Sequence, residues 1–203
     1  MRTIQDVLKH PNSVVTQPLH LEIVGLDTPV SVLSFVLTEE MNTRFLADII
    51  VTSQDKRIDG ATIVGQPAVF TIEEHASVPS MAAVIDPVRH AARTVHGVVT
   101  QWTRVKTSRD EATYQVHLKP RLSLLEEVHD SAVLLDRSFR ELLSDMIVDR
   151  DLFQSFDVEF ELEGLDGKLE QTVMYEETVA NFIDRHCRRA GVHYYFKQAT
   201  KED

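Results

Sequence analysis

Residues 172–196 read TVMYEETVANFIDRHCRRAGVHYYF, which predicts a strand, a capped helix, a glycine stop and a second strand. Residues 172–175 favour a strand, and Thr178 is a suitable N-cap for the helix that follows. Gly191 stands where a left-handed C′ residue would end that helix, before the β-branched and aromatic residues 192–196. Apolar residues recur along the helix at steps of three and four, which gives it one apolar face: Val179, Phe182, Ile183, Cys187 and Ala190.

The composition is that of an acidic globular chain. Of 203 residues, 43% are hydrophobic and 26% charged, and 32 Asp and Glu against 21 Lys and Arg give a net charge of −11. Nucleic-acid backbones and anionic membranes favour clustered cations, so we expect neither as a partner. A single cysteine, Cys187, excludes an intrachain disulfide and a Cys-rich zinc cluster.

The sequence carries no export or membrane signal that we recognise. The N-terminus lacks the apolar core of a signal peptide, and no apolar run approaches the roughly 20 residues of a membrane helix. We therefore expect synthesis in the cytosol and no membrane insertion. Any export would then need a dedicated machine.

The first 120 residues are predicted to be an arm followed by a β-barrel or small sandwich. Residues 1–18 form the arm, and alternating apolar residues from 19 onward indicate successive strands. Residues 76–92 are expected to be an exposed loop whose apolar patch, residues 81–85, could be a contact surface. Residues 94–103 and 113–118 predict a hairpin, with Gly97 marking a bulge or a close backbone approach.

After Pro120 the pattern predicts helices mixed with strands. Residues 122–128 indicate a short helix, and Ser138 with Glu141 forms a capping box for a longer one. Residues 158–162 and 169–175 are predicted strands, followed by the closing helix and strand. The expected fold class is thus α+β and β-rich: an arm (1–18), a barrel domain (19–120) and a smaller α+β subdomain (121–203).

Short motifs in a fixed order resemble the VgrG family of type VI secretion spike proteins and the related hub proteins of contractile phage tails. Each motif is common alone, but their order along most of the chain makes the resemblance specific. The tryptophans that often follow the fourth motif are missing, and Arg188 and Arg189 replace an acidic pair. The motifs are an opening hairpin at 34–45, VGQPA at 64–68, VHGVVT at 95–100, YQVHLKP at 114–120 and a segment at 131–143, followed by the stretch quoted above.

The resemblance implies a structural, non-enzymatic hub. Its tail-tube-like barrel would form a homotrimer whose ring caps the hexameric tube protein, with baseplate proteins as further partners. Longer relatives continue into a second barrel, a neck and a needle that carries the effector; the 203 residues contain none of these, so a fragment and a short family member both stay open. The resemblance also implies a bacterial cytoplasmic protein that the contractile apparatus later exports.

The sequence supports no catalytic, cofactor-binding or metal-ligating residue. His186 and Cys187 are adjacent on the predicted helix and point about 100° apart, so they cannot readily chelate one ion with His193. His96 has no paired nucleophile in a recognisable motif. The aromatic end of the quoted stretch, residues 194–196, is expected to be core. Four acidic pairs are interpreted as solvated or helix-end charges: Glu39-Glu40, Glu73-Glu74, Glu126-Glu127 and Glu176-Glu177.

The sequence leaves two alternatives to the secretion hub open. The first is the equivalent baseplate hub of a phage or phage-like tail, which shares the same domain. The second is a small hydrolase or metal enzyme that uses His96 or the region from His186 to His193.

Overall fold

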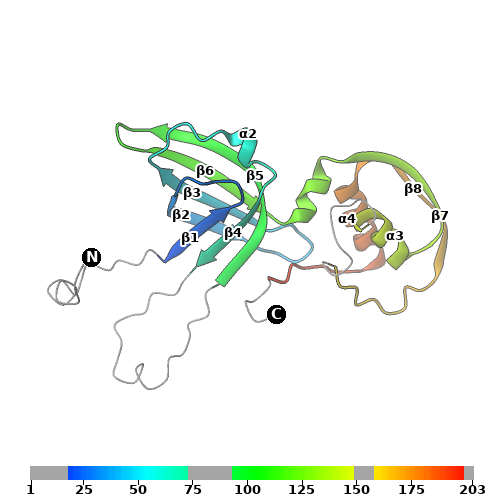
Figure 1. Ribbon diagram of the computed structural model, residues 1–203. Helices are drawn as coiled ribbons and strands as arrows, with labels where there is room; N and C mark the ends of the chain where they lie inside the picture. The colour runs from blue at the N-terminus through cyan, green and yellow to red at the C-terminus, as the bar shows by residue number, and fades with distance from the viewer. Residues whose placement is uncertain (1–17, 73–92, 149–157, 199–203) are drawn as a thin grey trace, which may run out of the picture.

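The computed structural model describes residues 18–72, 93–148 and 158–198, which fold into a six-stranded sheet and a smaller α+β part (Figure 1). The predicted arm up to residue 17, and the loop with its apolar patch at 81–85, lie outside the described residues. No helix in these three described ranges is long and apolar enough to cross a membrane.

The first part is an antiparallel sheet in the order β1-β4-β5-β6-β3-β2. It curls into a half-barrel, so that its edge strands β1 and β2 come into contact (Figure 1). A short helix, α2 (Gly60–Ile63), was not predicted from the sequence. The strands are β1 (Leu19–Ile23), β2 (Ser31–Thr38), β3 (Leu46–Ser53), β4 (Pro67–Ile72), β5 (Arg93–Thr107) and β6 (Ala112–Lys119).

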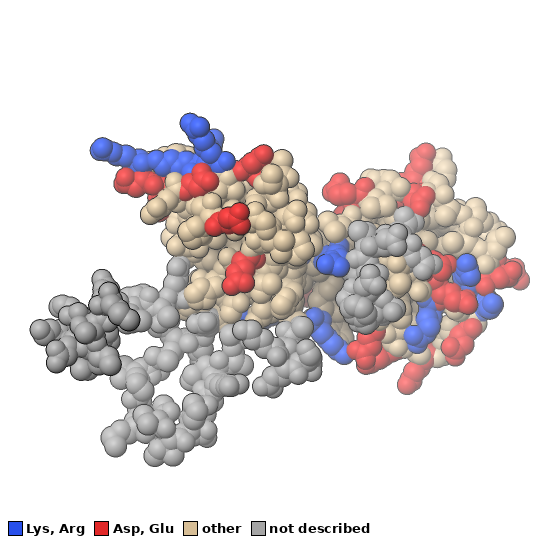
Figure 2. All heavy atoms as spheres, viewed as in Figure 1, with Lys and Arg blue, Asp and Glu red and all other residues tan. Residues whose placement is uncertain are grey.

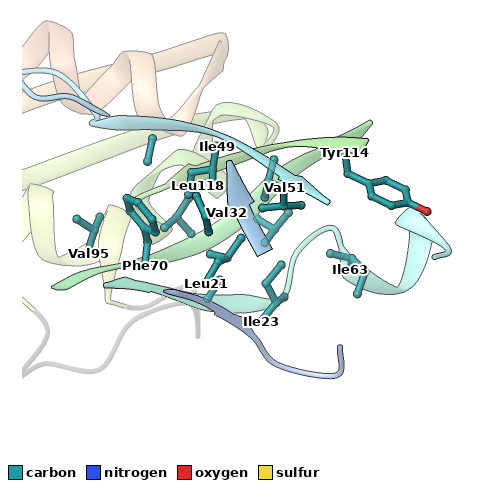
Figure 3. Packing of buried hydrophobic residues seen from close by; sticks show 14 of the residues in the cluster. Leu21, Ile23, Val32, Ile49, Val51, Ile63, Phe70, Val95, Tyr114 and Leu118 are labelled. Atoms are coloured by element: carbon teal, nitrogen blue, oxygen red, sulfur yellow. The ribbon is translucent and has the colours of Figure 1, made fainter. Parts of the chain in front are cut away.

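The core of this part fills the hollow of the curled sheet. Alternate residues of each strand point inward because successive side chains of a strand face opposite sides. Figure 3 shows these side chains meeting from every strand of the sheet and from α2. Among the most buried are Ile49, Val51, Phe70, Val95, Tyr114 and Leu118.

The predicted hairpin is β5–β6, and Gly97 has the close backbone approach expected of it. A Cβ at Gly97 would overlap the Lys119 carbonyl oxygen and lie 3.0 Å from the Leu118 side chain. At the far end of the hairpin, Trp102 packs against Tyr114 with ring centroids 4.9 Å apart. A side chain at position 97 would therefore push β6 away from β5.

The second part contains two strand–helix units on a two-stranded ribbon. After the 3₁₀ helix η2 (Arg121–Glu126), β7 (His129–Ser138) leads directly into α3 (Phe139–Ile147). In the same way β8 (Lys168–Thr178) leads into α4 (Val179–Ala190). β7 and β8 pair antiparallel, and both helices pack inside the ribbon (Figure 1).

Both helices begin as predicted. The Ser138 hydroxyl accepts from the Glu141 backbone N–H, and the Glu141 carboxylate accepts from the Ser138 N–H, which completes the capping box. Thr178 accepts from the Asn181 N–H. Gly191 ends α4 with φ 69° and ψ 21°, the left-handed conformation expected of it.

Two predicted strands are wrong, and one strand was missed. Residues 158–162 and 192–196 belong to no ladder among the described strands, because β8 pairs with β7 instead and the Tyr194 backbone bonds to Asn42. β7 was missed because its exposed side, with Val133 and Leu135, is as apolar as its inner side, so the alternation typical of strands is weak.

Candidate assembly surface

The titratable residues that the sequence singled out in and after α4 do not form a metal site. His186 and Cys187 are both buried, but His193 is exposed and its Nδ1 lies 2.9 Å from the Asn42 side-chain amide nitrogen. Burial raises the pKa of the Cys187 thiol to about 11, with the Asp184 carboxylate adding to the shift. Within the three described ranges, no three His, Cys, Asp or Glu residues are placed to hold a metal ion.

The other candidates lie apart from one another. His96 is exposed on β5, where its backbone N–H donates to the Gln198 side chain at 2.9 Å. Glu39 pairs with Arg93, and Glu177 pairs with Arg185. Glu73-Glu74 lies outside the described residues. These carboxylates serve ion pairs and helix ends, so no acid–base pair faces a common cleft in the described part of the chain.

A partly buried charge cluster joins the two parts of the molecule. Arg44, just before β3, donates to Asp184 of α4 at 2.9 Å and lies 3.3 Å from Glu126 of η2. Glu126 also receives Lys119, the last residue of β6, at 3.1 Å. The Arg44 side chain is only 12% exposed, so these interactions are weakly screened by solvent. The cluster fixes how the α+β part lies against the sheet.

The C-terminal segment at residues 194–196 makes a second set of contacts at the same junction. Tyr194 donates through its hydroxyl to Asp184 at 2.9 Å, and burial together with this bond raises the pKa of Tyr194. The Asn42 N–H donates to the Tyr194 carbonyl at 3.0 Å, and the Tyr194 N–H donates back to the Asn42 side chain at 3.0 Å. Phe196 packs edge-on against Phe45, with ring centroids 5.7 Å apart. The aromatic end is thus junction core, as expected.

Sequence reasoning missed the junction residues Arg44 and Asn42. Arg44 lies 140 residues from its partner Asp184, and Asn42 lies 152 residues from Tyr194. Nothing in the local pattern signals such a pairing. The positive φ of Asn42, 62°, is visible only in the folded chain.

The curled sheet has two edge strands, and one of them, β2, exposes apolar side chains. Among the described strands, β1 forms a ladder only with β4 and β2 only with β3, so each has one edge without a ladder partner, and the two edge strands approach each other. On β2, Leu33 is 59% and Val36 is 65% exposed, and Met41 follows at 62%. Unpaired edges with apolar side chains favour association with another chain.

The β7–β8 ribbon carries a second exposed apolar face. Val133 lies opposite Val173 in the ladder, and both point away from the helices. Tyr175, at 72% exposure, extends the same face. Its other members are Leu135 and Leu169.

Charge is unevenly distributed over the surface. Figure 2 shows basic side chains gathered over the end of the β5–β6 hairpin, with acidic and further basic side chains scattered over the rest of the visible face. Arg104 donates there to the Lys56 carbonyl at 2.8 Å, and Lys56 donates to the Arg109 carbonyl. Lys106 and Arg57 lie in the same region.

The architecture and the sequence both match known proteins. The family model of the phage tail baseplate hub (GPD) matches residues 38–203. The chain belongs to this hub family. The VgrG-like, phage-hub resemblance of the sequence motifs and the predicted fold class are thereby confirmed.

Individual relatives of this hub-family chain are spike and tail proteins. The type VI secretion system spike protein VgrG1b of Pseudomonas aeruginosa is 25% identical over 159 residues, which are 78% of this chain and 19% of VgrG1b. VgrG1c of the same organism is 24% identical over 187 residues, 90% of this chain and 24% of VgrG1c. The chain thus spans about a fifth to a quarter of the curated relatives it matches.

Solved structures of tail and secretion proteins share the fold of this chain. The E. coli c3393 protein, described as a type VI secretion component structurally similar to T4 tail proteins gp27 and gp5, matches with a TM-score of 0.75 and 29% identity, over 89% of this chain and 45% of c3393. A 43 kDa tail protein of prophage MuSo2 from Shewanella oneidensis matches with a TM-score of 0.52 over 85% of this chain and 50% of its own. At 11% identity, the second match shows the shared fold alone.

Proposed function

We propose that this chain is the N-terminal hub region of a type VI secretion spike, which trimerises and caps the stack of the hexameric tube protein. The observation that carries the proposal is the pair of edge strands β1 and β2 of the curled sheet, with apolar side chains exposed on β2, held at a fixed angle to the α+β part by the Arg44 cluster. Such edges can join copies into a ring, and the junction would keep the ring's geometry rigid.

The family supports the same role. The curated relatives are type VI spike proteins, and the family model describes a baseplate hub. By analogy, baseplate proteins and an effector are further partners, with assembly in the bacterial cytoplasm followed by export through the apparatus. A phage-like tail hub is the second candidate, favoured by the shared fold of the prophage tail protein.

Light scattering over a concentration series tests trimerisation. We expect a trimer that forms weakly, at high concentration. Val36→Lys places a charge on the β2 edge and should abolish the trimer. Val105→Lys is the matched control, because Val105 has a similar exposure, 59%, but lies on the inner strand β5. A tight two-fold dimer, or a monomer even at millimolar concentration, would contradict the ring.

Co-sedimentation with assembled tubes separates the two candidates. The wild-type chain should pellet with a type VI tube protein and not with a phage tail-tube protein. The reverse result would assign the chain to a phage-like tail. Binding to neither tube, by a chain that does form trimers, would reject the capping role while leaving the hub family intact.

A further inference from the structure

A groove runs through the β8–α4 unit. It has a volume of about 590 Å³ and lies between β8, the turn at residues 164–167 and the C-terminal half of α4. This volume is within the range of sites that hold small ligands or a few peptide residues. Its floor is part of β8, from Leu169 to Val173, and its far wall is α4 from Arg185 to Ala190.

The edge of β8 that faces this groove is unpaired in the described part of the chain, since β8 forms a ladder only with β7. The Arg185 side chain donates to the Val173 carbonyl at 3.3 Å, which places that carbonyl on the free edge. In an antiparallel ladder, backbone groups of every second residue point to the same edge. The backbone groups of Gln171 and Leu169 therefore also face the groove.

His186 is a buried polar residue that the fold of its unit does not require. Its side chain lines the groove and is 6% exposed, and its Nε2 has no hydrogen-bond partner among the described residues. Forty residues earlier, Met146 occupies the same place in α3 and is buried without a polar group. A buried polar atom without a partner is costly, so retaining one here points to a ligand that supplies the partner.

The groove wall is also cationic in a protein of charge −11. Arg189 lines it and makes no ion pair with any described residue, whereas Arg185 is held by Glu177. Burial first, and then Arg185 and Arg189, lower the pKa of His186, so its ring is neutral at pH 7. A carboxylate placed here would pair with Arg189 and, with the ring proton on Nε2, would also accept a hydrogen bond from His186.

We propose that this groove binds an extended acidic segment of a partner protein, which adds a strand to the free edge of β8 and places a carboxylate against Arg189 and His186. The backbone groups of Leu169, Gln171 and Val173 would bind the peptide main chain, and the cationic wall would select the acidic residue. Strand addition of this kind takes affinity from main-chain hydrogen bonds and specificity from the side-chain pockets beside them.

Hydrogen exchange tests the free edge without any ligand. The amides of Leu169, Gln171 and Val173 should exchange faster than those of Thr172 and Met174, which face β7. Uniformly slow exchange along β8 would show that the edge is already paired and would overturn the proposal. If protection of these amides instead grows with protein concentration alone, the occupant is a second copy of this chain and the partner-peptide proposal is rejected.

Binding is tested with the peptide Ac-Thr-Val-Thr-Val-Asp-NH₂ by NMR titration of the ¹⁵N-labelled chain. We expect shifts at the Leu169, Gln171 and Val173 amides and at the His186 ring, and roughly tenfold weaker binding of the peptide that ends in Asn. Arg189→Glu should weaken binding by roughly tenfold or more. Arg188→Glu is the matched control, because Arg188 is its exposed neighbour on α4 and does not line the groove.

His186→Met introduces the residue that α3 has at the equivalent position, Met146. This variant separates a binding role of His186 from a structural one. This variant should raise the melting temperature, since it removes an unpartnered polar atom. It should still weaken binding of the Asp peptide by about tenfold. Absence of any shift in the β8 amides at millimolar peptide would overturn the proposal. Equal binding of the Asp and Asn peptides, or equal effects of the two arginine variants, would also overturn it.

Discussion

The β7–α3 and β8–α4 units follow the same plan, with equivalent residues forty positions apart. In each, an acidic residue with positive φ, Asp136 or Glu176, stands two positions before the N-cap. The buried positions of α3 correspond to those of α4: Phe139, Leu142, Leu143, Met146 and Ile147 to Val179, Phe182, Ile183, His186 and Cys187.

An ion pair is conserved in place and reversed in sign between the units. Arg137 of β7 lies 3.0 Å from Asp145 of α3, and Glu177 of β8 pairs with Arg185 of α4 at the equivalent positions. The plan therefore requires opposite charges there but not a particular order. Where the second unit departs from the first, at Asp184 and His186, its side chains face the junction or the groove.

The largest expected effect is in the shared core. Phe182→Ala should lower the free energy of unfolding by about 3–5 kcal/mol, because Phe182 is fully buried and its removal leaves a cavity. The equivalent Leu142→Ala should cost about 2–5 kcal/mol. Urea denaturation followed by circular dichroism measures both. A loss below about 1 kcal/mol for either residue would show that the two helices do not share one core.

The second-largest expected effect is a loss of folding stability at high pH, and it is expected in the β8–α4 unit alone. Cys187 has a raised pKa of about 11, so folding favours its neutral thiol. The resulting stability is fully present below the unfolded pKa of about 8.5 and is lost as the pH rises through 11. We expect a loss of about 2–3 kcal/mol between pH 8.5 and 11.

Urea unfolding at several pH values measures this loss. The raised pKa of Tyr194 acts in the same direction from about pH 10 upward. Cys187→Val, which imitates the aliphatic Ile147 of α3, should lose less stability over this range. Parallel pH profiles for the two proteins would contradict a role for the thiol.

A smaller effect distinguishes the helix ends. α4 ends at the left-handed Gly191, whereas α3 ends at Val148 in the right-handed helical region. Gly191→Val should cost about 1 kcal/mol or more, because a β-branched residue resists positive φ. Gly191→Asn should cost only a few tenths, since Asn tolerates that conformation. Thermal melts compare the two, and equal, negligible changes would speak against this type of helix end.

The smallest effect tests the reversed ion pair. Glu177→Arg alone should cost up to about 1 kcal/mol, since it creates a like-charge contact with the partly exposed Arg185. Adding Arg185→Asp, which reproduces the order of the first unit, should recover most of this loss. A double variant no more stable than the single one would mean that the two units are not interchangeable at this position.

The elements that follow local rules could be read from the sequence, and those that depend on distant partners could not. The helix ends could be predicted from Ser138, Thr178 and Gly191, because capping interactions involve residues only a few positions apart. Residues 192–196 have the composition of a strand, but no described strand pairs with them, and their backbone bonds run to Asn42 and to Cys187 at the end of α4. Strand propensity describes a half-buried surface and does not provide its ladder.

The assembly surface was predictable only in outline. The alternation in residues 19–118 indicated a β-rich domain, but which strands form its edges depends on the order β1-β4-β5-β6-β3-β2. The groove beside β8 escaped prediction for a similar reason. His186 falls on an apolar helix face, where a structural histidine is the usual case, and only the three-dimensional arrangement shows that its Nε2 has no described partner.

The packing of Trp102 against Tyr114 gives each half of the molecule its own optical signal. Trp102 is the only tryptophan, so indole emission reports on the sheet. The two longest described helices lie in the other half, so ellipticity at 222 nm reports chiefly on the α+β part. If the Arg44 cluster transmits unfolding across the junction, both signals change at the same temperature, as a two-state transition requires. Arg44→Ala should then separate the two curves.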